Sequence, residues 1–105
     1  MGKPDTRQVD REIQRTTRKL EAVRQREMWP LTGPERRAIV GALASGSYRI
    51  ARGRSTGSAD RRLETAWSAA ETRLAAEIAA LQTERQRIVN EAAAAKAATK
   101  SSGWW

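Results

Sequence analysis

Apolar positions in the first quarter of the chain recur at a spacing typical of helices. Five mostly apolar residues form two interleaved rows with seven-residue spacing: Val9, Thr16 and Val23 in one row, Ile13 and Leu20 in the other. Such a seam is typical of a helix that packs along another helix. Because Pro30 disfavours helical geometry at the residue before it, the pattern predicts a helix over residues 6–28.

A second helix begins with a capping signal. Thr32 and Glu35 have the spacing of a capping box, in which the side chain of each residue accepts a hydrogen bond from the backbone N–H of the other. Pro34 is tolerated in the first helical turn. Because Gly53 follows a weak, glycine-containing segment, the sequence predicts a helix over residues 34–52.

The third helix has the strongest pattern. Ser58 can cap its start, and a strict seven-residue row follows: Trp67, Leu74, Leu81 and Ile88. An alanine-rich segment extends the helix-forming sequence to about residue 99. A helix over residues 58–99 would be a rod of about 60 Å.

These elements predict an all-α fold: a long, coiled-coil-like antiparallel hairpin with a shorter helix between its arms. Two arrangements fit. The first two helices can lie end to end along the third, or the chain can fold into a three-helix bundle with an overhanging third helix. We expect one helical domain over residues 1–100 and a tail at 101–105. The predicted helix–helix seam consists of Val9, Ile13, Leu20, Val23, Trp67, Leu74, Ile78, Leu81 and Ile88.

Self-association is expected from the length of the third helix. Its distal seam positions, Leu81 and Ile88, would extend beyond a first helix of about 35 Å, so another chain would be needed to cover them. The heptads are too few and too interrupted to define an oligomer number. We therefore predict a homo-oligomer of undetermined size.

Composition argues against an enzyme. The chain has no histidine and no cysteine, which are the usual general base, thiolate nucleophile and transition-metal ligands. Its three aspartates show no pairing suited to two-carboxylate catalysis. We expect no catalytic residues, no metal and no cofactor.

The chain also shows no sign of a membrane span or of a secretory signal. No apolar run approaches the length of about 20 residues that a membrane-spanning helix needs. The first residues lack the apolar stretch of a secretory signal. A cytoplasmic location is the expectation.

Positive charge is concentrated before residue 63. The net charge is +8, and residues 29–62 carry seven basic and two acidic groups. Five arginines flank a Gly/Ser-containing turn and are candidate contacts for nucleic acid or another anion: Arg49, Arg52, Arg54, Arg61 and Arg62. A helix-turn-helix fits poorly, because the turn is loose and Asp60–Arg61 falls where an apolar residue should pack. The alternative is a solvated elbow between two helices.

Four arginines also form a stripe on the predicted first helix: Arg7, Arg11, Arg15 and Arg18. One interpretation is phosphate contact. The other is pairing across the seam with a glutamate row on the third helix: Glu64, Glu71, Glu77, Glu84 and Glu91. The matching signs favour pairing.

The sequence ends in two tryptophans after a Ser-Ser-Gly spacer. Each of Trp104 and Trp105 could bury well over ~150 Å² of surface, so water is a poor environment for them. They could anchor a partner, where tryptophan is enriched among energetically dominant residues. They could also pack on the chain's own helices or lie at a lipid interface, although the adjoining alanine helix supports the lipid interpretation poorly.

The sequence predicts a small, basic, non-enzymatic binding protein. It would act as an accessory or regulatory factor that contacts nucleic acid or an acidic partner surface, with Trp104 and Trp105 as a partner anchor. The partners would be the chain itself, another protein and, in one interpretation, nucleic acid. The alternative is a structural coiled-coil assembly or scaffolding component in which the charges serve pairing and solubility.

Overall fold

The protein is all-helical, as predicted. A computed structural model describes residues 4–102, which form three helices and no strand: α1 (Arg7–Arg24), α2 (Gly33–Ala51) and α3 (Gly57–Ser102). The molecule is a rod with principal dimensions of 84 × 18 × 18 Å. Within the described range, no helix has the length and apolar character needed to cross a membrane.

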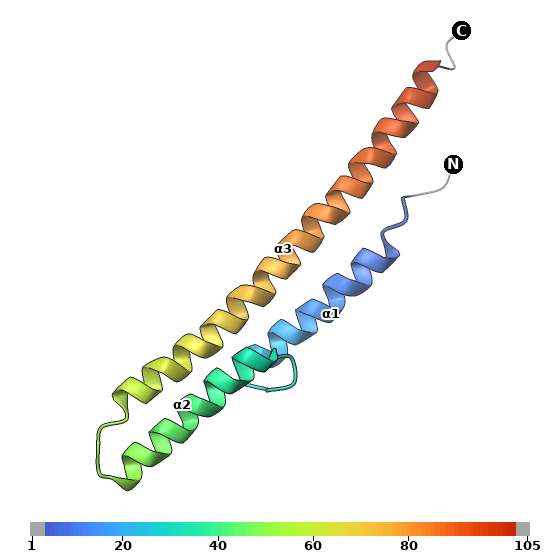
Figure 1. The fold of residues 1–105 in the computed structure, drawn as a ribbon. Coiled ribbons are helices and arrows are strands. Elements are labelled where there is room, and N and C mark those ends of the chain that lie inside the picture. The colour runs from blue at the N-terminus through green and yellow to red at the C-terminus, as the bar shows by residue number, and fades with distance from the viewer. Residues whose placement is uncertain (1–3, 103–105) are drawn as a thin grey trace.

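The two short helices lie one after the other along the long one. α1 and α2 both pack against α3, and they do not pack on each other (Figure 1). Both run antiparallel to α3, so the structure has the end-to-end arrangement rather than a three-helix bundle. α3 continues past the start of α1, and its last turns have no companion among the described helices (Figure 1).

α1 ends at Arg24, four residues before the predicted boundary. Arg26 adopts a left-handed conformation with φ 64°, which terminates the helix. The N–H of Glu27 donates to the carbonyl of Ala22 at 2.9 Å, and that of Arg26 donates to Val23 at 2.9 Å. This is a Schellman motif with arginine where glycine is usual. Sequence rules place such stops at glycine or asparagine, so this one could not be predicted.

α2 begins with the predicted capping box. The backbone N–H of Thr32 donates to Glu35 Oε1 at 2.9 Å, and the N–H of Glu35 donates to the Thr32 hydroxyl at 3.4 Å. The helix ends at Ala51, and Gly53 has φ 68°, so glycine supplies the left-handed residue here. With 19 residues, α2 is not shorter than the 18-residue α1.

α3 is longer than predicted at both ends. Its 46 residues span about 70 Å. The helix starts at Gly57, one residue before the predicted range, because Thr56 rather than Ser58 occupies the capping position. The carbonyl of Thr56 accepts from the N–H of Asp60 at 2.8 Å, and its hydroxyl donates to the Asp60 carboxylate at 3.1 Å.

The core lies where α1, the α1–α2 linker and α2 meet the first half of α3. Its buried apolar side chains are Leu20, Val23, Leu31, Ile39, Trp67, Ala70 and Leu74. Four side chains pack against them in partly buried positions: Met28, Leu63, Ala66 and Ile78. Each fully buried aliphatic side chain contributes about 1.5–3 kcal/mol, so this small cluster carries most of the hydrophobic stabilisation.

The predicted seam residues fall into two groups. Leu20, Val23, Trp67 and Leu74 are buried in the core. The remaining five are only partly buried: Val9, Ile13, Ile78, Leu81 and Ile88. Packing between α1 and α3 therefore weakens toward the far end of the rod.

Candidate anion-binding end of the hairpin

One end of the rod holds most of the unpaired positive charge. We call residues 36–62 the arginine end; it comprises most of α2, the α2–α3 turn and the start of α3. Its single acid is Asp60, and its seven arginines are Arg36, Arg37, Arg49, Arg52, Arg54, Arg61 and Arg62.

The antiparallel turn brings the five predicted anion-contact residues to one end of the molecule. Arg49 lies in the last turn of α2, and Arg52 is its C-cap. Arg54 follows in the turn, and Arg61 and Arg62 lie in the second turn of α3. The turn itself is the end of the hairpin opposite to the start of α1 (Figure 1).

These side chains find little compensation within the chain. Arg49 Nη1 donates to the carbonyl of Ser55 at 3.5 Å, and the guanidinium of Arg52 lies 5.5 Å from the centre of the Tyr48 ring. No arginine of this end forms an ion pair with a described carboxylate. Since Asp60 can offset only one of the seven arginines, the arginine end keeps a strong positive field.

The rest of the rod is different, because its charges are mostly paired. Helix α1 is joined to α3 by Arg85 Nε and Asp10 Oδ1 at 2.8 Å. On α3, Arg87 bridges Glu84 and Glu91. The positive field is thus local to the arginine end.

The predicted pairing between the α1 stripe and the glutamate row is wrong. Arg7 pairs with Asp5 and Arg15 with Glu12, both within their own segment. Neither Arg11 nor Arg18 pairs with a described acid, and all four stripe residues are exposed. The stripe lies on the side of α1 away from its seam, so it cannot reach α3.

The glutamate row instead finds arginines that the sequence did not single out. Arg26 Nη2 lies 3.0 Å from Glu64 Oε2, and its other terminal nitrogen lies 3.9 Å from Glu71. The same guanidinium lies 5.3 Å from the centre of the Trp67 ring. Arg73 binds Glu77 at 2.9 Å.

A half-buried ion pair fixes α2 on α3. Arg73 Nε donates to Glu35 Oε2 at 2.8 Å, and Arg73 Nη2 donates to Glu35 Oε1 at 3.0 Å. Arg73 Nη2 also donates to the carbonyl of Pro30 at 3.3 Å. The hydrogen bonds from Arg73 hold the pKa of Glu35 below its ordinary value of 4.5. This contact orients the arginine end but uses none of its arginines.

A shallow groove runs beside Arg61 and Arg62. It has a volume of about 460 Å³ and is lined by Ala38, Ser58, Arg61, Arg62, Thr65, Ala66 and Ala69. Guanidinium and hydroxyl groups both donate hydrogen bonds to phosphate oxygens. Because alanine side chains are small, the groove stays open to the sugar-phosphate backbone of a nucleic acid.

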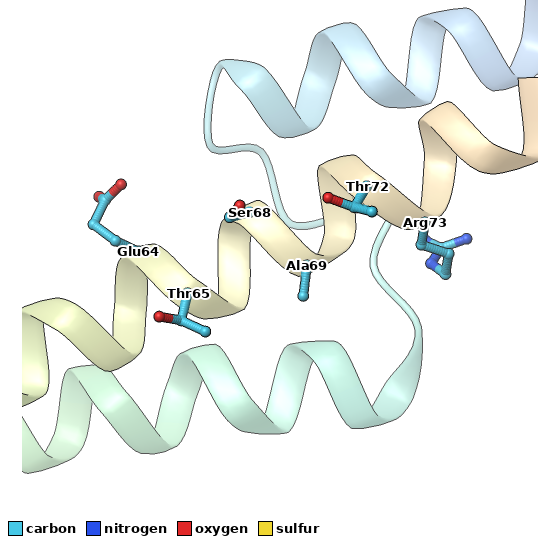
Figure 2. A pocket seen from close by; sticks show the side chains of 6 residues that line it. All are labelled: Glu64, Thr65, Ser68, Ala69, Thr72 and Arg73. Atoms are coloured by element: carbon cyan, nitrogen blue, oxygen red, sulfur yellow. The ribbon is translucent and has the colours of Figure 1, made fainter.

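The neighbouring hollow on α3 is less suited to an anion. Figure 2 shows its lining side chains, with Glu64 and Arg73 at its two ends and small residues between: Thr65, Ser68, Ala69 and Thr72. Its cation, Arg73, is already bound to Glu35 and Glu77, and its carboxylate repels negative ligands.

The described residues offer no cluster of three potential metal ligands among aspartates and glutamates. The predicted partner anchor, Trp104 and Trp105, lies outside the described residues. Comparison of the chain with models of protein families, with curated proteins and with solved structures found no match.

Proposed function

We propose that this chain is a non-enzymatic accessory protein that binds nucleic acid through the phosphate backbone, with the arginine end as its contact surface. The observation that carries the proposal is the charge distribution. Seven arginines and a single acid lie at one end of a rod, and the charges of the rest of the rod are mostly paired with one another. Guanidinium groups suit phosphate because their planar donor geometry matches its oxygens.

Backbone contact fits this surface better than base reading. The arginines sit on the outside of a hairpin end rather than on one exposed recognition helix. Tyr48, the aromatic residue of this end, has the Arg52 guanidinium against its ring, so it is poorly placed to stack a base. We therefore expect little sequence preference and a preference for duplexes, whose phosphates are regularly spaced.

The test is a titration of labelled duplex DNA, single-stranded DNA and duplex RNA with the protein and two variants. One variant replaces Arg49, Arg52 and Arg54 by alanine. The matched control removes the same charge from α1 by replacing the exposed, locally paired arginines Arg7, Arg15 and Arg24. We expect the first variant to bind at least tenfold more weakly than the control variant, because it removes phosphate contacts rather than net charge alone.

The second candidate function is a structural coiled-coil assembly component that touches no nucleic acid. The long unaccompanied end of α3, together with the partly buried Leu81 and Ile88, favours it. In that case the protein and both variants bind nucleic acid equally weakly. Its solution mass would then exceed that of one chain and fall when Leu81 and Ile88 are replaced by serine.

A further inference from the structure

α2 carries a further row of apolar residues that the described chain covers only in part. Val40, Leu43, Ser47 and Ile50 follow a 3–4–3 spacing, which places them in one row of a heptad pattern. We call this row the outer seam. Val40 is 51% exposed, Leu43 52% and Ile50 70%. Leu43 and Ile50 lie only about 40° and about 20° around the helix from the buried Ile39, so this row widens the apolar face of α2 beyond the part that α3 covers.

The seam that α2 uses against α3 has mostly smaller side chains. Ile39 and Ala42 are buried there, and Gly46 brings the helices close enough that an added Cβ would lie 3.6 Å from Ala59 Cβ. The outer seam thus holds more large aliphatic side chains than the inner one, yet it faces solvent. Solubility alone gives no reason for that arrangement.

An apolar groove continues the outer seam onto α3. It has a volume of about 400 Å³ and is lined by Arg26, Met28, Ile39, Leu43, Leu63, Glu64 and Trp67. Five of its seven lining side chains are apolar, and Leu43 belongs to both the groove and the seam. The two together form one surface between α2 and α3.

The charges around this surface select the occupant. Arg36 lies one heptad before Leu43 on the face of α2 that carries the seam, and it forms no ion pair with a described carboxylate. A second copy packed on this seam would bring together two arginine ends, each with seven arginines and a single acid, and parallel packing would also place Arg36 next to its own copy. Like charges facing each other at a seam are destabilising. Glu64, the acid that lines the groove, is paired with Arg26 at 3.0 Å.

We propose that the outer seam and its groove dock an acidic amphipathic helix of another protein. Its apolar side chains would cover Val40, Leu43 and Ile50, and a carboxylate would meet Arg36. Helix-in-groove recognition of this kind uses anchors at helical spacing. The occupied surface would make a three-helix arrangement at the arginine end.

This proposal stands apart from nucleic-acid binding because it uses another face. Leu43 of the outer seam and Ala38 of the groove beside Arg61 and Arg62 are five residues apart, which is about 140° around the helix. Phosphate contact and helix docking can therefore be separated by substitution.

The experiment measures how tightly the protein binds a labelled synthetic peptide of 18 residues. The peptide has leucine at the apolar seam positions of a heptad repeat and glutamate at the positions that flank the seam. A scrambled peptide of the same composition controls for attraction between net charges. The test variant is V40S/L43S/I50S, which leaves the protein's charge unchanged. The control variant, A75S/A76S/A79S, changes three exposed alanines of α3. Circular dichroism of each variant verifies that the helices persist.

We expect the amphipathic peptide to bind at least tenfold more tightly than the scrambled one, and the outer-seam variant to lose this preference while the control variant retains it. Equal binding of the two peptides overturns the proposal. So does a dimer that the outer-seam variant dissociates, since a second copy is then the occupant. Seam-dependent binding to vesicles of anionic lipid, without peptide preference, also overturns it. Duplex DNA binding should be the same in the outer-seam variant as in the unaltered protein.

Discussion

Glu35 and Arg73 join three parts of the molecule: the α1–α2 linker, the start of α2 and the middle of α3. Their side chains are 15% and 30% exposed, so solvent screens the pair only in part. Arg73 makes two hydrogen bonds to the Glu35 carboxylate, at 2.8 and 3.0 Å, and a third to the carbonyl of Pro30 at 3.3 Å. Since hydrogen bonds to charged groups contribute about 1.5–3 kcal/mol each and partial exposure lowers this, we expect Arg73→Met to cost about 2–3 kcal/mol.

That cost corresponds to a fall in Tm of roughly 10–20 °C for a chain of about 100 residues. A double-mutant cycle of Glu35→Gln and Arg73→Met, followed by urea unfolding with far-UV circular dichroism, isolates the pair. Glutamine keeps an oxygen to accept from the N–H of Thr32, so the cap is retained. We expect a coupling free energy of about 1–3 kcal/mol. A coupling free energy below about 0.5 kcal/mol would refute the reasoning, because this partly buried ion pair would then contribute no more to stability than an exposed one.

The same pair predicts the response to acid. Because the pKa of Glu35 is lowered in the folded protein by its bonds from Arg73, its contribution to stability is complete above the ordinary value of 4.5 and is lost as pH falls through the lower, folded value. The stability difference between the unaltered protein and Glu35→Gln should therefore be largest near neutral pH and should shrink below pH 4.5. A difference that is constant across this range would show that the carboxylate charge is not involved.

Two further sets of substitutions and one deletion test other parts of the molecule. In urea unfolding, Arg26→Gly should be more stable than Arg26→Ala by about 1 kcal/mol. Both variants lose the contacts to Trp67 and Glu64, but only glycine adopts the positive φ without strain. Equal stabilities of the two variants would contradict this. Leu74→Ala, at a site with no exposure, should cost about 2–5 kcal/mol in the same assay, and a loss under about 1 kcal/mol would place the core elsewhere. Deleting Trp104 and Trp105 should leave helicity intact and abolish capture of a protein partner, whereas a matching loss of helicity would assign them to the core.

Much of the fold could be predicted because it follows from periodicity and capping. The interleaved rows of α1, the capping box at Thr32 and the seven-residue row of α3 all depend on local spacing, which the sequence shows directly. Gly53 ended α2 close to its predicted boundary for the same reason. The end of α1 escaped prediction because Arg26 takes a conformation that its residue type disfavours.

Charge pairing was harder to predict than packing. Matching signs suggested that the arginine stripe of α1 faces the glutamate row of α3, but the stripe lies on the outer side of its helix. Arg26 and Arg73 satisfy much of that row instead, from a linker and from α3 itself. Long side chains can choose among several partners within reach, so their pairing depends on tertiary geometry that spacing does not encode. The outer seam of α2 was missed because an intervening polar residue, Ser47, breaks its apolar row.

The most direct test of the account is the salt dependence of duplex DNA binding by the unaltered protein and by Arg49/Arg52/Arg54→Ala. If each of these arginines neutralises one phosphate, the slope of log K against log salt concentration should become less steep by about 2.7 on their removal. The α1 control variant, which loses the same charge at Arg7, Arg15 and Arg24, should keep the slope of the unaltered protein. Identical slopes for all three proteins would contradict the claim that the arginine end is a phosphate-binding surface.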